Sequence, residues 1–168
     1  FPALVRFNTN NAFYNGFASS RGYDLRFTTT DNRRLNHEFD GAWNRFGESL
    51  TWVQIPHLTS STTIWAYWGN PADNTQPAFT TNGATWHDGY NGVWHMNQTT
   101  VRDVTEGEHH ASFSEDVTAT PGVIGTANSF NRDNGSLIRI PAHSDWEQTG
   151  DFTISAWIYD SGRQSGEH

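Results

Sequence analysis

The first half of the chain shows the alternation of apolar and polar positions that is typical of β-strands. In the segment DLRFT, for example, Leu25 and Phe27 fall on one face of an extended backbone. Four segments carry this alternation or a high density of β-branched and aromatic side chains: residues 3–7, 24–28, 50–55 and 62–68. Pro56 ends the third segment, so residues 57–61 are predicted to form a short hairpin connection to the fourth.

The second half has weaker and more widely spaced strand signals. Residues 73–91 are rich in Pro, Asn, Thr and Gly and are predicted to form a linker or long loop. Further strands are predicted at residues 92–96, 129–130, 136–140 and 152–159. Little helix is expected, with one turn at most within residues 11–20. Short strands joined by Gly, Asn and Asp turns predict an all-β fold, an antiparallel β-sandwich or jelly roll built as two tandem β units.

The composition favours a folded protein outside the cell and disfavours nucleic-acid binding. The chain has 168 residues, of which 14% are aromatic, so a few large rings can fill a core. The net charge is −8 and every basic residue is a scattered Arg, whereas nucleic-acid binding needs a basic stripe. Cys is absent, and no apolar run is long enough to insert into a membrane. The acidic, Asn-, Thr- and Gly-rich surface suits an extracellular or saline setting, and we expect an extracellular or cell-surface location; we favour solubility over charge-based recognition as the purpose of the charge.

Four spaced motifs occur in the first 72 residues: FPALV, GYDLRFT, WVQIP and YWGNP, at residues 1–5, 22–28, 52–56 and 67–71. Residues 1–72 therefore resemble a bacterial and archaeal domain family of unknown function, numbered 2341, in which similar motifs stand in this order. The resemblance implies a small β-sandwich domain. The family normally has one more strand before the opening motif, and this strand is missing here.

Three further motifs, VWHMN, GVIG and FTISAW, lie at residues 93–97, 122–125 and 152–157. With them, residues 92–168 resemble the first part of a laminin-G-like, concanavalin A-like jelly roll. The two families commonly occur in tandem, and such a jelly roll normally continues for several strands after the third motif. Half a jelly roll would leave strand edges unpaired. We therefore expect either a fragment of a longer chain or a sheet that a partner chain completes, and we favour the fragment.

Motifs that would support catalysis are missing. The sequence contains no GxSxG nucleophile elbow, no Gly-rich phosphate loop and no HExxH metal motif. Glycoside hydrolysis needs two placed carboxylates, but no short run of acidic residues typical of catalytic jelly rolls is present. We therefore predict that these residues do not form an enzyme.

Two groups of residues are candidates for binding a metal. Asn131, Asp133 and Asn134 in NRDNG offer oxygen ligands for calcium, which is the most plausible cofactor; a plain Asx turn is the favoured alternative. The segment EGEHH holds the densest set of ligand-type side chains: Glu106, Glu108, His109 and His110. We favour a solvated polar loop for this segment, because its spacing matches no known metal motif.

Aromatic side chains give the best signal for a ligand. In TTIWAYWGN, alternation places Ile64, Ala66 and Trp68 in the core and leaves Trp65 and Tyr67 partly exposed. Trp and Tyr rings bind the flat C–H faces of sugars. The candidate sugar-binding residues are Trp43, Trp65, Tyr67 and Trp86, with core or inter-domain packing as the alternative for each. Three further rings that lie within strands and family motifs are assigned to the core: Trp52, Trp94 and Trp157.

These observations leave three hypotheses for function. The first is a non-catalytic carbohydrate-binding or adhesive module of an exported multidomain protein, whose partner is a glycan. The second is a structural or assembly domain of a cell-surface or filament protein, whose partners are neighbouring domains or chains. The third is an ancillary part of a polysaccharide-degrading enzyme.

Asp24 and Arg26 share a strand face and are interpreted as structural, forming a cross-strand ion pair or a ladder of polar contacts.

Overall fold

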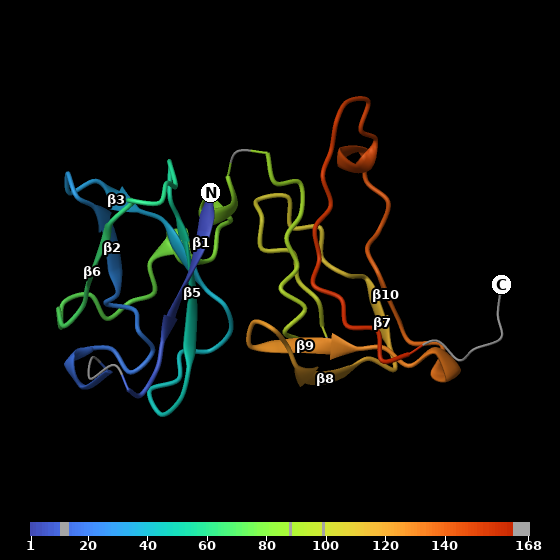
Figure 1. Ribbon diagram of the computed structural model, residues 1–168, viewed down its shortest axis with the longest axis horizontal. Helices are drawn as coiled ribbons and strands as arrows, with labels where there is room; N and C mark the ends of the chain where they lie inside the picture. Colours follow the sequence, from blue (N-terminus) through green and yellow to red (C-terminus); the bar gives the residue numbers. More distant parts are fainter. Residues whose placement is uncertain (11–13, 88, 99, 163–168) are drawn as a thin grey trace.

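The computed structural model describes residues 1–10, 14–87, 89–98 and 100–162 (Figure 1). In this part of the chain, all regular structure consists of short strands in antiparallel sheets and of single 3₁₀ turns. The prediction of an all-β, antiparallel fold with little helix is therefore confirmed. One 3₁₀ turn, η1 (Tyr14–Gly16), lies where a helical turn was expected, and residues 11–13 are outside the described residues. No helix in the described part has the length and apolarity that a membrane span requires.

The first unit contains two three-stranded sheets. One sheet has the order β1-β5-β4 and the other the order β3-β2-β6. Their strands are β1 (Pro2–Phe7), β2 (Arg26–Thr29), β3 (Arg34–Leu35), β4 (His37–Phe39), β5 (Ser49–Gln54) and β6 (Ile64–Tyr67). Both sheets and the η1 region contribute to one buried cluster, whose members are Phe7, Tyr14, Phe17, Leu25, Phe27, Leu35, Val53 and Ile55. The two sheets thus enclose a single hydrophobic core between them.

The connection between β5 and β6 differs from the sequence prediction. Residues 57–61 were expected to close a hairpin, but β5 pairs with β1 and β4, whereas β6 pairs with β2. Because β5 has a partner on each side, it offers no free edge to β6. The chain after Pro56 therefore crosses from one sheet to the other, and the hairpin prediction is wrong.

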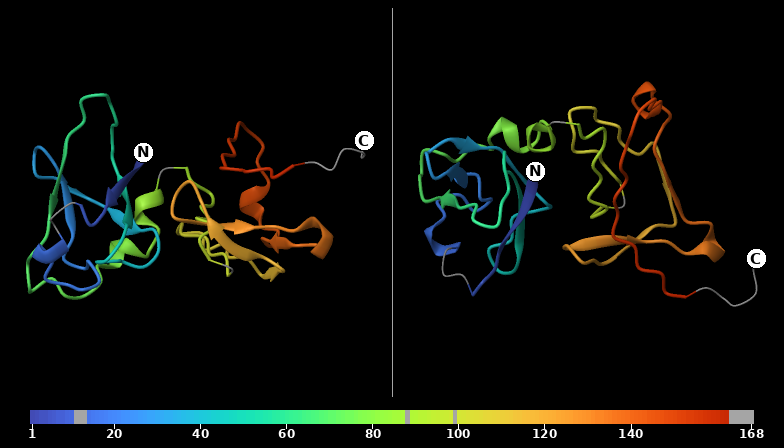
Figure 2. Two further views of the ribbon diagram at one scale, coloured as in Figure 1. Left: turned by 60° about the horizontal axis from the view of Figure 1, so that its bottom comes forward. Right: turned by 45° about the horizontal axis from the view of Figure 1, so that its top comes forward.

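The sheet β1-β5-β4 is covered on its outer face as well. Residues 73–91, expected as a linker or long loop, include the 3₁₀ turns η2 (Ala78–Thr80) and η3 (Ala84–Trp86), which pack against β4 and β5. Figures 1 and 2 show these green turns beside β5, between β1–β6 and the part of the chain that holds β7–β10. The loop after β8 also reaches this sheet, since Arg6 donates a hydrogen bond to the carbonyl of Val123 at 3.1 Å. A sheet covered on both faces must carry apolar or partnered side chains on both.

The second unit is built from two small ladders. β7 (Phe113–Glu115) pairs with β10 (Leu137–Arg139), and β8 (Thr118–Pro121) pairs with β9 (Thr126–Ser129). Two 3₁₀ turns, η4 (Arg132–Asn134) and η5 (Ser144–Trp146), complete the list of elements. This part of the chain buries few side chains, with Val101 and Val117 as its buried apolar residues among those described.

The strand expected at residues 152–159 is not formed, which corrects the sequence prediction. This segment has no ladder with any strand in the described part, and the Trp157 side chain is 80% exposed instead of buried in a core. A strand is stable only when a neighbouring strand accepts its backbone hydrogen bonds. The alternating apolar side chains of this segment therefore lie uncovered.

Asp24 has the structural role that the sequence suggested, but with different partners. Its buried carboxylate accepts backbone N–H groups of Ala18 at 2.8 Å, Ser19 at 3.1 Å and Gly69 at 2.7 Å. Arg26 forms its ion pair with Asp73 at 3.2 Å and not with a cross-strand carboxylate. Asp24 thus ties the chain before β2 to the chain after β6.

His37 is a polar residue at the centre of the core. Its side chain is fully buried and is surrounded edge-on by the rings of Phe27, Phe39 and Phe79, at centroid distances of 5.3, 5.5 and 5.1 Å. Neither ring nitrogen has a hydrogen-bond partner among the described residues. Burial, and secondarily the charge of Arg26, lowers the pKa of His37 from 6.5 to about 3.

This lowered pKa predicts a loss of stability in acid. The unfolded chain binds a proton at His37 below pH 6.5, whereas the folded chain does so only near pH 3, so the free energy of unfolding falls across that interval. We expect the variant His37→Leu to lose less stability between pH 6.5 and pH 4 than the wild type, measured by chemical denaturation. His57→Leu, at an exposed position, is the control. Equal pH slopes for wild type and His37→Leu would contradict this assignment.

Candidate functional site

The outer face of the sheet β3-β2-β6 carries an exposed pair of aromatic rings. Trp65 and Tyr67 lie on the same face of β6 and are 53% and 49% exposed. Residues two apart in a strand are separated by roughly 7 Å, so the two rings are close neighbours. Large apolar side chains that cluster on a surface are an informative sign of binding. This surface is called the β6 aromatic face below.

The inward side chains of β6 hold the β6 aromatic face in position. Ile64, Ala66 and Trp68 pack against the core cluster, as the alternation predicted. The Trp68 ring stacks on Phe17 with the centroids 5.2 Å apart and the planes 9° from parallel. Because successive side chains point to opposite faces, this packing directs Trp65 outward on a strand that is itself well fixed.

Polar side chains from the neighbouring strands border the two rings. In the ladder, Tyr67 lies opposite Arg26 and Trp65 lies opposite Thr28, which in turn pairs with Arg34 on β3. Arg26 is held by Asp73 and by the carbonyls of Tyr23 and Leu25, each at 2.7 Å. Arg34 is exposed. The face thus combines two aromatic side chains with one guanidinium held by Asp73 and one exposed guanidinium.

The other two candidate sugar-binding rings are packed into the protein. Trp43 belongs to the core, with its ring 5.3 Å from Phe7 and 4.9 Å from Phe17 between centroids. Gly22, which has a φ of +70°, lies against this indole so closely that a Cβ would be 2.6 Å from it. Trp86 is buried and donates its indole N–H to Glu38 at 2.6 Å. These rings take the packing role that was the alternative for each, because neighbouring side chains cover their faces.

A cavity of about 710 Å³ lies beside the junction of the two units. Its lining mixes aromatic edges with charged and amide side chains, including Arg21, Trp43, His95, Asn97 and Arg102. A concave site with a few convergent polar groups is the usual form of a ligand pocket.

Two carboxylates on β4 and just after it organise this junction. Glu38 is buried and accepts hydrogen bonds from Trp86 and from His95, whose Nε2 lies 2.8 Å away. Asp40 accepts the indole N–H of Trp52 at 3.0 Å and a hydrogen bond from Asn97. The rings of Trp52 and His95 are stacked, 5.9 Å apart. This set of contacts joins the first unit to the start of the second.

His95 is more basic than an isolated histidine. Burial by itself would lower its pKa, but the hydrogen bond that His95 donates to Glu38 and the charges of Asp40 and Glu38 together outweigh burial and raise the pKa above 6.5. The imidazolium therefore persists to higher pH in the folded protein than in the unfolded chain. A charged His95 between two carboxylates stabilises the junction.

The proposed calcium ligands form a turn. Asn131 accepts the backbone N–H of Asp133 through its side-chain oxygen at 2.9 Å and so caps η4, which ends at Gly135 with a φ of +69°. All three residues, Asn131, Asp133 and Asn134, are exposed. This is the Asx turn that was the alternative reading, and calcium binding here stays a prediction.

The EGEHH segment is only partly the solvated loop that was expected. Glu106 and Glu108 are exposed, but His109 turns inward and its side chain is 9% exposed. Its imidazole meets His143 and Asp145, which are more than thirty residues away in the sequence. Spacing within the segment could not reveal this cluster, because two of its three members lie elsewhere in the chain.

Comparisons of the chain with protein-family models, with curated proteins and with solved structures found no match. The resemblance of residues 1–72 to the unknown-function family, and of residues 92–168 to laminin-G-like domains, therefore stays a prediction. The case for a function depends on the geometry of the sites described above.

The raised pKa of His95 predicts a loss of stability in alkali. The stabilisation from the charged histidine is fully present below pH 6.5 and is lost as the pH rises through the raised pKa of the folded state. We expect His95→Gln, which keeps a hydrogen-bonding side chain, to lose less stability than the wild type between pH 6.5 and pH 9. Chemical denaturation at several pH values measures this, with His57→Gln as the control. If His95→Gln loses as much stability as the wild type between pH 6.5 and pH 9, this assignment is wrong.

Proposed function

We propose that this chain is a non-catalytic carbohydrate-binding or adhesive module of an exported multidomain protein, and that the β6 aromatic face binds the glycan. The observation that carries the proposal is the pair Trp65 and Tyr67, exposed side by side on a strand fixed by the core. Sugars present flat apolar C–H faces that stack on such rings. The extracellular location is part of the proposal and is supported by the acidic, Lys-free composition.

The polar border of the β6 aromatic face suits the hydroxyl groups of a sugar. Arg34 is exposed on β3, on the far side of β2 from Trp65, and its guanidinium has donors in a fixed planar arrangement. The guanidinium of Arg26 is already oriented by Asp73, 3.2 Å away, so little conformational entropy is lost when a ligand binds. A platform with donors at its edge favours a neutral or acidic glycan over a cationic ligand.

The prediction is that single substitutions on the β6 aromatic face remove glycan binding. We expect Trp65→Ala or Tyr67→Ala to lower the affinity for a glycan found by array screening at least tenfold, because each removes one stacking surface. Affinity electrophoresis with the soluble polysaccharide measures the change. Both side chains are about half exposed, so the variants should keep the wild-type melting temperature.

The matched control is Phe46→Ala, since Phe46 is exposed on a loop away from β6. Glycan binding should be unchanged in this variant. The proposal is overturned if no glycan binds the wild type, or if binding survives the loss of both Trp65 and Tyr67.

A second candidate function is assembly with neighbouring chains. The specific observation is the uncovered segment at residues 152–159, in which Ile154, Trp157 and Ile158 are at least 80% exposed. An extended apolar segment with free backbone groups can add as a strand to the edge of another sheet. In this role the chain is a structural domain of a surface or filament protein.

Assembly predicts self-association that depends on this segment. We expect the wild type to form dimers or larger species at about 100 μM, a range in which weak protein contacts become populated. The double variant Ile154→Ser with Ile158→Ser should stay monomeric, as measured by sedimentation velocity. Val123→Ser, which removes a different exposed apolar side chain, is the control. A wild type that is monomeric at every concentration would exclude this function for the isolated chain.

A further inference from the structure

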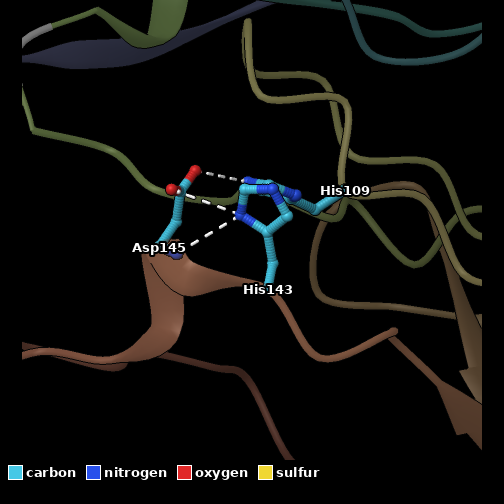
Figure 3. Close-up of side chains that lie close together, drawn as sticks. All are labelled: His109, His143 and Asp145. Atoms are coloured by element: carbon cyan, nitrogen blue, oxygen red, sulfur yellow. Dashed lines mark hydrogen bonds and ion pairs between the residues drawn. The ribbon is translucent and has the colours of Figure 1, made fainter.

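Three metal-ligating side chains meet on the second unit, apart from the β6 aromatic face. His109 Nε2 lies 2.9 Å from Asp145 Oδ2, and His143 Nδ1 lies 3.2 Å from Asp145 Oδ1. One ligand atom from each residue falls within 4.8 Å of the other two. Figure 3 shows the two imidazoles and the carboxylate pointing toward one another. Two donors of one tetrahedral ion stand roughly 3.4 Å apart, so these three need to move little to share an ion.

The loop that carries His109 is held rigidly by buried groups. Asp103 is buried and accepts the backbone N–H of His109 at 2.9 Å, together with the N–H groups of Val93 and Thr105. The carbonyl of His109 accepts the indole N–H of Trp94 at 3.0 Å. Outer contacts of this kind orient metal ligands and limit the entropy lost when an ion binds.

The other two of the three ligands come from a single turn. His143 and Asp145 flank the start of η5 (Ser144–Trp146), so both side chains are presented from one short piece of backbone. The carbonyl of Asp145 accepts a hydrogen bond from Asn91 at 3.2 Å and another from Gln148. The Trp146 ring packs on the His109 imidazole, with centroids 4.7 Å apart. The turn and the loop thus face each other across the cluster.

A hollow adjoins the cluster on the side of Asp145. Gly107 is so close that a Cβ there would lie 2.8 Å from His109 Nε2, so a side chain at this position would crowd the ligand nitrogen. A hollow of about 160 Å³ is lined by Gly107 and Asp145, with Glu106 and Asn91 on the same rim. His143 and Asp145 are 49% and 47% exposed, so an ion can reach them from solvent.

We propose that His109, His143 and Asp145 bind one Zn²⁺ ion, with water from the adjoining hollow as its fourth ligand. Two imidazole nitrogens and one carboxylate oxygen are ligands that Zn²⁺ accepts in tetrahedral geometry. Calcium is disfavoured at this cluster, because it requires six to eight oxygen ligands. The ion would replace the hydrogen bond between His109 and Asp145, and it would take the Nδ1 lone pair of His143, which accepts the backbone N–H of Asp145 at 3.3 Å in the structure without metal.

The bound ion would link segments that are distant in the sequence. His109 precedes β7 (Phe113–Glu115), whereas His143 and Asp145 follow β10 (Leu137–Arg139), and these two strands pair with each other. A metal at this point closes the end of the β7–β10 ladder in a unit that buries few apolar side chains. The role is stabilisation, and it does not depend on glycan binding by the β6 aromatic face.

The test is to titrate the metal-stripped chain with zinc chloride. Isothermal titration calorimetry measures the binding, and thermal melting measures the stability at each zinc concentration. We expect one Zn²⁺ per chain and a melting temperature that rises with zinc concentration. His143→Ala and Asp145→Asn should each weaken binding at least about 100-fold, since removing a ligand costs no less than disturbing its outer contacts. Both side chains are half exposed, so both variants should fold.

Two controls separate this site from ordinary surface histidines and from the NRDNG turn. His57→Ala removes an exposed imidazole on the first unit, and Asp133→Ala removes the carboxylate of the turn capped by Asn131; both should bind zinc as the wild type does. Titration with calcium chloride should change the melting temperature of the wild type and of His143→Ala by the same amount, because calcium is not expected to bind at this cluster. Zinc binding that survives His143→Ala, or no zinc binding at all, overturns the proposal and leaves the cluster as a hydrogen-bonded cap of η5.

Discussion

A buried carboxylate between two parts of the chain determines how the rest of the molecule is arranged. Glu38 points away from the sandwich core, yet it is buried, because Trp86 and His95 cover it and donate to it at 2.6 and 2.8 Å. A buried charge without such partners would cost several kcal/mol, so the segments on either side of residue 90 must lie on this face. The sheet β1-β5-β4 is therefore enclosed on both sides. Of the two three-stranded sheets, β3-β2-β6 is the one whose outer face carries the exposed aromatic pair.

Strands whose pattern is local and strong could be predicted from the sequence. β1, β2, β5 and β6 lie within one or two residues of the predicted segments, because each has alternating or β-branched side chains that need one apolar surface to cover them. The orientation of β6 followed from its two-residue period alone. The exposure of Trp65 was predicted for the same reason: if Ile64 and Ala66 are buried, their neighbours must face outward.

Features that depend on tertiary partners could not be predicted in this way. β4 is three residues long and places His37 in the core and Glu38 under another segment, so its sequence is too polar to be recognised as a strand. The covering of Trp86 depends on Glu38, which lies forty-eight residues earlier. The cluster of His109 with Asp145 is likewise long-range. Residues 152–159 show the converse case, where a clear alternation lacks a partner strand in the described part of the chain.

The two uncovered apolar features differ in what a partner would have to supply. On β6 the backbone is already paired with β2, and the inward side chains fix the strand, so Trp65 and Tyr67 need only a surface that stacks on them. A small, flat ligand can provide this without ordering any of the chain. In residues 152–159 both the side chains and the backbone lack partners among the described residues. Only another strand supplies apolar contact and backbone hydrogen bonds together, and ordering the segment adds an entropic cost that a sugar could not offset. The glycan proposed for the β6 aromatic face and the neighbouring chain proposed for residues 152–159 therefore have different requirements to meet.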